Sequence, residues 1–122
     1  MPLKKWDLLR VYRNDLRQPH DKYCICVCPT KKLFFYINSC PPKFHKKREF
    51  ALEVENFEIT CITKTSYIDT TTLIDDLPEA ALNEALSDPK RQHGSVSPTL
   101  QQKIIATVRA HNALSPEHMS LF

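Results

Sequence analysis

The sequence has a single glycine, Gly94, among 122 residues. Loops that cradle phosphates need several glycines, because backbone amides can approach a phosphate closely only where no side chain intervenes. A nucleotide-dependent enzyme is therefore not expected, and no cofactor is predicted.

No Cys-x-x-Cys pair occurs among the five cysteines. Cys24, Cys26 and Cys28 alternate, so they are expected to share one face of a strand. At about 3.3 Å per residue the outer two would start about 13 Å apart, too far for a compact tetrahedral zinc site. An odd number of cysteines also favours reduced thiols over a disulfide framework. We expect buried thiols that pack as small hydrophobic groups, and no metal site.

No apolar run is long enough to span a bilayer, and residues 1–10 lack the apolar core and cleavage site of a signal peptide. The apolar fraction of 42% and the charged fraction of 25% are ordinary for a folded protein. One soluble, cytoplasmic domain with no membrane contact is expected. The net charge of +3 is small, so direct nucleic-acid binding is not expected. The basic segment Lys43 to Arg48 (KFHKKR) is read as a solvated loop or as a contact for nucleic acid.

Strand patterns occupy the first half of the chain. Two of them, 22–28 and 32–38, are separated only by Pro-Thr-Lys and should form an antiparallel hairpin whose strands are buried on both faces. A small curled barrel would bury such strands in about 65 residues. The runs rich in aromatic and β-branched residues are WDLLRVY (6–12), KYCICVC (22–28), KLFFYIN (32–38), EFALEV (49–54) and EITCI (58–62).

Helix patterns follow after Asp69, which makes the expected fold class α+β. PEAALNEAL (78–86) has proline at its start and good helix formers after it. A second helix starts at Ser97-Pro98 and ends near 112–114, with Leu100, Ile104 and Val108 at four-residue steps on its apolar face. Ser115-Pro116 repeats the start signal, but too few residues follow for a helix that is stable alone.

Polar residues gather at one end of the predicted hairpin. His20 and Lys22 begin its first strand, and Ser39 follows its second. Chain reversal places these ends side by side. Histidine can act as a general base and lysine can hold a phosphate, so the group fits either an RNA-cleaving site or ordinary strand-end polarity.

The stretch TKTSYIDTTTLIDDLPEAALNEAL (63–86), followed by GSVSP (94–98) and an amphipathic helix, resembles the second half of PemK/MazF-like toxins. Trp6-Asp7, followed by LLRVY, resembles that family's opening Gly-Asp strand with the glycine replaced. The resemblance covers residues 5–114. It implies an SH3-like curled antiparallel β-barrel with two or three attached α-helices, often as a homodimer.

The same resemblance offers a metal-independent endoribonuclease as the alternative function, but this sequence matches only part of that family's catalytic site. Ribonuclease members carry an Arg-Pro pair leading into the second strand, and Lys22-Tyr23 stands there instead. Lysine lacks the planar fork with which arginine holds a phosphate. Ser39 matches the threonine or serine that often follows the third strand. We therefore expect a toxin domain over 1–114 that is not an enzyme, and a C-terminal tail over 115–122.

The tail carries a second resemblance. His118-Met119-Ser120-Leu121-Phe122 is similar to the motif Gln-Leu-Ser/Asp-Leu-Phe, by which bacterial polymerases and repair proteins bind the replication sliding clamp. Leu121 and Phe122 match directly, Met119 replaces the first leucine, and His118 replaces glutamine. The resemblance implies a toxin of a type II toxin-antitoxin system that binds the DNA polymerase sliding clamp. It also implies a cognate antitoxin, which delivers such a toxin to a cytoplasmic protease. The alternative is a tail docked on its own sheet.

Overall fold

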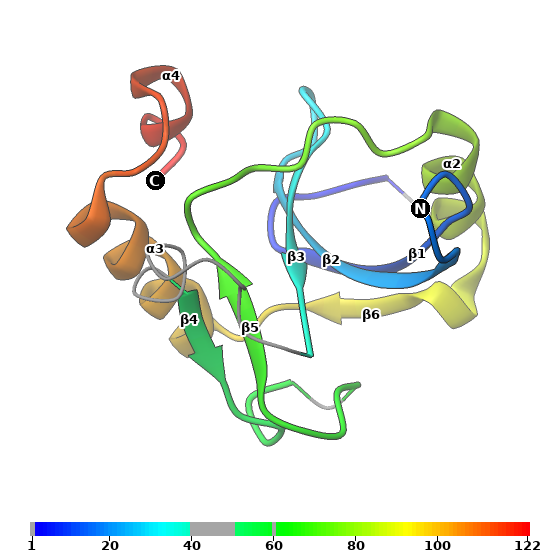
Figure 1. Cartoon of the computed structure of the whole chain (residues 1–122), viewed down its shortest axis with the longest axis horizontal. Coiled ribbons are helices and arrows are strands. Elements are labelled where there is room, and N and C mark those ends of the chain that lie inside the picture. The colour runs from blue at the N-terminus through cyan, green and yellow to red at the C-terminus, as the bar shows by residue number, and fades with distance from the viewer. Residues whose placement is uncertain (1, 40–50, 60) are drawn as a thin grey trace.

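The computed structural model describes residues 2–39, 51–59 and 61–122 (Figure 1). The basic segment Lys43 to Arg48 lies outside the described residues, as does Cys40. The fold is α+β, as expected. Its strands are β1 (Asp7–Arg13), β2 (His20–Cys28), β3 (Leu33–Ile37), β4 (Ala51–Val54), β5 (Ser66–Asp69) and β6 (Gln92–Ser95), and its helices are α2 (Glu79–Ser87), α3 (Pro98–His111) and α4 (Pro116–Met119), with a 3-10 turn at Pro89–Arg91.

Four strands form an antiparallel sheet in the order β3-β2-β1-β6, and β4 and β5 form a second, two-stranded sheet. The predicted hairpin is confirmed, because β2 and β3 pair antiparallel with Ile25 opposite Phe35. Two isolated bridges, Asn38 to Tyr67 and Phe34 to Ile74, connect the β3 segment to the chain around β5. The described strands do not close into a barrel, so the SH3-like barrel stays a prediction.

The central strand β2 is buried on both faces, which also agrees with the sequence prediction. Its alternating side chains enter two separate apolar clusters. The α3-side cluster contains Ile25 and Phe35 with residues of β4, β5 and α3. The α2-side cluster contains Cys24 and Phe34 with Leu82 of α2. Helices therefore cover opposite faces of the sheet, as Figure 1 shows.

Helix α3 begins where the sequence indicates. The Ser97 hydroxyl accepts a hydrogen bond from the Leu100 amide at 3.2 Å, and Pro98 occupies the first helical position. The apolar stripe is confirmed, because Leu100, Ile104 and Val108 are buried. At the other end Asn112 adopts a left-handed conformation and closes the helix, with its amide bonded to the Val108 carbonyl.

Two sequence predictions are wrong, and one strand is missing from the predicted elements. The described residues of the run 58–62, namely 58, 59, 61 and 62, do not form a strand: the Ile62 amide bonds to the Ile59 carbonyl, and both isoleucine side chains are buried in the core. Strand β6 was not predicted, since QHGS is polar and short. Cys28 does not share a face with Cys24 and Cys26. The register shifts between Cys26 and Cys28, and this bulge places Cys28 in the α3-side cluster.

Within the described ranges, no helix combines the length and apolar character needed to cross a membrane.

Removing the Ser97 cap should weaken the fold measurably. Ser97→Ala loses the bond to the Leu100 amide, and such a loss costs about 1 kcal/mol. Urea unfolding would measure it. Thr99→Ala is the matched control, because Thr99 is exposed in the same first turn and leaves the cap intact. Equal losses in both variants would show that the cap is not what stabilises the helix start.

Candidate functional site

The tail, residues 115–122, consists of the short helix α4 (Pro116–Met119) and a turn that follows it up to Phe122. It starts at Ser115, whose hydroxyl accepts a hydrogen bond from the His118 amide at 3.3 Å. After α4 ends, the Leu121 amide bonds to the His118 carbonyl at 3.0 Å and the Phe122 amide to the Met119 carbonyl at 3.1 Å. The clamp-like motif therefore begins in α4 and continues in a turn, and so short a helix cannot persist without contacts to the rest of the protein.

Apolar contacts hold the tail against the domain. Met119, Leu121 and Phe122 are partly buried and pack against the α3-side cluster. The Phe122 ring lies 5.8 Å from the ring of Phe35, centroid to centroid, in a tilted arrangement. Figure 1 shows α4 and the chain end on the side of the molecule where α3 lies. All three side chains keep part of their surface in solvent.

Three basic residues from separate segments also contact the tail. Lys5, ahead of β1, donates a hydrogen bond to the Leu121 carbonyl at 2.6 Å, and its ammonium lies 5.8 Å from the Phe122 ring centroid. Lys31, in the turn between β2 and β3, pairs with Glu117 at 2.6 Å. Arg109 of α3 donates to the main-chain oxygen of Phe122. We call Lys5, Lys31 and Arg109 the basic clasp.

The second candidate is the polar end of the hairpin. Lys22 donates to the Asn38 side-chain oxygen at 2.9 Å, and its ammonium lies 5.0 Å from the Tyr36 ring centroid. Burial lowers the pKa of Lys22. Hairpin pairing therefore brings Lys22 beside the residues that follow β3, as the sequence predicts. A pocket of about 210 Å³ opens on the same side, lined by Tyr36, Asn38, Asp69, Thr72 and Ile74.

Arg13 is a residue that the sequence reasoning missed. It ends β1, is buried, and lies close enough to Lys22 to depress that residue's pKa. Its guanidinium donates to both oxygens of Asp15, to the Tyr36 hydroxyl and to Asp76 at 3.3 Å. The bond to Asp15 is the main reason why the pKa of Arg13 is raised. An arginine is thus present beside Lys22, but its guanidinium is already bonded to the carboxylates of Asp15 and Asp76. Arg13 lies opposite His20 where β1 pairs with β2, and this register is visible only in the structure.

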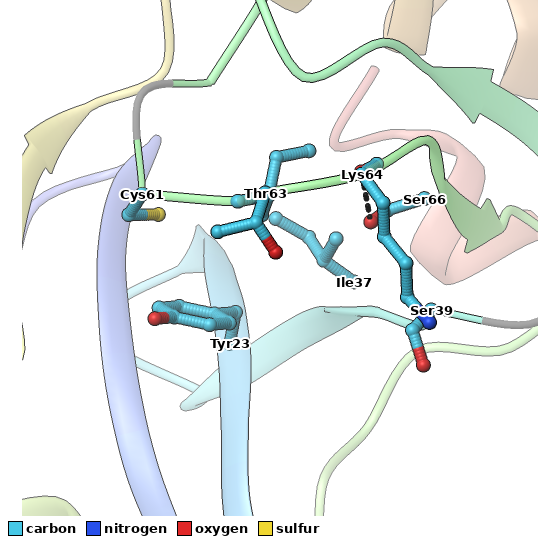
Figure 2. A pocket seen from close by; sticks show the side chains of 8 residues that line it. Tyr23, Ile37, Ser39, Cys61, Thr63, Lys64 and Ser66 are labelled. Carbon is cyan, nitrogen blue, oxygen red and sulfur yellow. Dashed lines mark hydrogen bonds between the residues drawn. The ribbon is translucent and has the colours of Figure 1, made fainter.

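The other predicted residues are split between two faces. His20 precedes Lys22 by two positions on β2, is exposed, and has its ring Nδ1 2.5 Å from the Gln18 carbonyl. Ser39 instead lines a pocket of about 220 Å³ with Tyr23 and Ile37, on the α3 side (Figure 2). Figure 2 shows the Lys64 side chain extended toward Ser39. The fold therefore brings Lys22 and Asn38 together, whereas Ser39, the next residue, lines a different pocket.

This division limits the chemistry of the hairpin end. A ribonuclease of this kind needs a base, a cation and a hydroxyl around one phosphate. Here Ser39 lines the other pocket, whereas Asp69 lines the pocket with Tyr36 and Asn38, and Asp76 pairs with Arg13. The carboxylates would repel a phosphate.

The cysteines are packed apolar groups in the part of the chain that the structure describes. Burial raises the pKa of Cys24 and of Cys26 to about 12. The pKa of Cys28 is lowered, mainly by its hydrogen bond with the Thr30 hydroxyl. Among the described residues, no group of three or more His, Cys, Asp or Glu is arranged to hold a metal ion.

Comparisons of the chain with protein-family models, with curated proteins and with solved structures gave no match.

Thiol labelling tests the placement of these cysteines. In the folded protein at pH 8, iodoacetamide should alkylate Cys28 at least about tenfold faster than Cys24 or Cys26, because only the thiolate reacts. Peptide mass spectrometry gives the rates, and the chain in urea, where the three should react alike, is the control. Labelling of Cys24 as fast as Cys28 in the folded state would contradict the two-faced burial of β2.

Proposed function

We propose that this protein is the toxin of a type II toxin-antitoxin system, and that it inhibits DNA replication by binding the polymerase sliding clamp. Met119, Leu121 and Phe122 are the anchors that enter the apolar cleft of the clamp, with Ser120 as the small spacer and His118 in the place of glutamine. Occupying that cleft excludes polymerases and other clamp-binding proteins. The protein acts in the cytoplasm and is not an enzyme.

One observation carries the proposal: the three anchors lie together, partly exposed, on a segment outside the sheets. Full burial of a leucine or phenylalanine is worth about 1.5–3 kcal/mol each, so part of that energy is still available to a partner. Ordering the tail costs about 1–2 kcal/mol per residue. Full burial of three anchors gives at most about 9 kcal/mol, so the net apolar contribution is smaller than the roughly 8 kcal/mol of a micromolar complex, and contacts of the tail main chain with the clamp must supply the rest.

The scaffold supports a PemK/MazF-like assignment in two places. Trp6, which stands where that family has glycine, holds a φ of +74°, a conformation that glycine adopts most easily. Strand β5, a polar turn and α2 also follow one another in the order that the resemblance implies. We further propose that the two sheets form an SH3-like barrel. The isolated bridges from Phe34 to Ile74 and from Asn38 to Tyr67 support this proposal, because they connect the two sheets.

A toxin-like scaffold with a clamp motif resembles the replication-inhibiting toxin SocB. The proposal therefore includes a SocA-like antitoxin, which binds this chain and delivers it to a cytoplasmic protease. A homodimer is compatible with the family resemblance.

The alternative, a MazF-like endoribonuclease using His20, Lys22 and Ser39, is less favoured. Ser39 lines a different pocket, and the fork of Arg13 is engaged by Asp15 and Asp76. The pocket beside Lys22 and Asn38 is lined by Asp69 and Thr72 and not by Ser39.

Removing two anchors should weaken clamp binding. Leu121→Ala/Phe122→Ala deletes the apolar groups that match the motif directly, and we expect the dissociation constant for purified sliding clamp to rise at least about tenfold. Surface plasmon resonance with immobilised clamp measures it.

Phe57→Ala is the matched control for this experiment. Phe57 is 81% exposed in the turn after β4, so its loss also removes an aromatic surface group. It should leave clamp affinity unchanged. Equal affinity of the wild-type chain and the double alanine variant would refute the role of the tail, and no binding by either would refute the partner.

The order in which synthesis stops distinguishes the two functions in cells. Upon expression in bacteria, incorporation of labelled thymidine should fall before incorporation of uridine or leucine, because clamp binding blocks replication directly. The double alanine variant should produce no arrest. A fall in uridine and leucine incorporation that precedes the fall in thymidine would favour the endoribonuclease instead.

A further inference from the structure

We infer that the docked tail is a self-inhibitory latch, in which the domain occupies the residues that the tail would otherwise offer to the clamp. This inference rests on the proposed function and adds a regulatory step to it. The free protein would alternate between a closed state, with the tail on the α3-side cluster, and an open state that binds.

The two states exclude each other because they use the same side chains. Phe122 cannot stack beside Phe35 while its ring lies in a partner's cleft, and Met119 and Leu121 pack against the same cluster. A partner can therefore bind only those molecules whose tail is undocked. Its apparent affinity is the intrinsic affinity reduced by that fraction, so any change that opens the tail tightens binding.

The geometry points to a pivot at Ser115-Pro116. Just before it, Leu114 is buried in the core, and Asn112 closes α3. Just after it, the exposed fraction rises and the tail makes its own short turn, capped within itself by Ser115. The tail can thus leave the domain without disturbing α3.

The basic clasp stabilises the closed state only weakly, so the latch can open. Lys31 and Glu117 have side chains that are 52% and 70% exposed, and such an exposed pair shifts an equilibrium by only about two- to fivefold. Lys5 and Arg109 hold main-chain oxygens of the last two residues from opposite ends of the sequence. Because all three contacts run from a cation on the domain to an oxygen on the tail, reversing a clasp charge should open the latch.

Hydrogen exchange tests the opening without any partner. In the wild-type chain, the amides of Met119 to Phe122 should exchange by local opening, at a rate that low concentrations of urea barely change. The amides of β2 should instead exchange by global unfolding and respond steeply to urea. If the tail amides exchange only with β2, the tail is a permanent part of the domain and the inference is overturned.

Charge reversal tests the competition. Lys31→Glu places a carboxylate opposite Glu117, so tail exchange should become faster and clamp affinity should tighten, each by about two- to fivefold. The swap Lys31→Glu/Glu117→Lys restores attraction and should return both values to those of the wild-type chain. Faster exchange with unchanged or weaker clamp affinity would overturn the inference.

Synthetic peptides of residues 115–122 separate this inference from the proposed function. The wild-type peptide, which has no domain to dock on, should bind the clamp more tightly than the full chain does. A second peptide carries Glu117→Lys. Its affinity for the clamp shows how much of the change measured for the Lys31→Glu/Glu117→Lys chain comes from direct contact between residue 117 and the clamp. If the wild-type peptide does not bind the clamp, the proposed function fails, whatever the exchange rates are. If it binds no more tightly than the full chain, the function stands and the latch fails.

Discussion

The double-sided burial of β2 is the constraint on which the rest of the structure depends. Cys24, Ile25 and Cys26 are fully buried, so each face of the sheet needs an apolar cover. Helix α2 covers one face, and α3 with β4 and β5 covers the other. The pairing of β2 with β3 also positions polar groups at the end of the hairpin, because the contact between Lys22 and Asn38 follows from the register of these two strands.

The tail completes the cover of the α3 side, but only in part. Phe122 reaches Phe35, a core residue, while its own surface stays partly in solvent. The apolar side chains on which the proposed clamp binding rests also pack against the domain that carries the tail. Hydrophobic contact is not directional, so the specificity of the closed state must come from the basic clasp. Self-docking and the proposed clamp binding would thus use the same side chains.

The sequence was informative where a local signal coincided with burial. Ser97-Pro98 and the four-residue apolar stripe located α3, and two adjacent apolar runs located the β2–β3 hairpin. Features that depend on tertiary contact were not predictable. The bulge at Cys28 reflects the register against β3, and the polar strand β6 exists because β1 offers it a partner. Arg13 bonds to the nearby Asp15, but also to Tyr36 and Asp76 from distant segments. The tail motif was visible in the sequence, whereas its docking on Phe35 was one of two alternatives that only the fold could separate.

The central claim is that the tail exchanges one apolar partner for another. Solution NMR of the uniformly labelled chain tests it most directly, through nuclear Overhauser contacts between the rings of Phe122 and Phe35. The account predicts that these contacts are present in the free protein and disappear when sliding clamp is added, while contacts within the β2–β3 hairpin persist. Contacts between the two rings that persist at saturating clamp would contradict it.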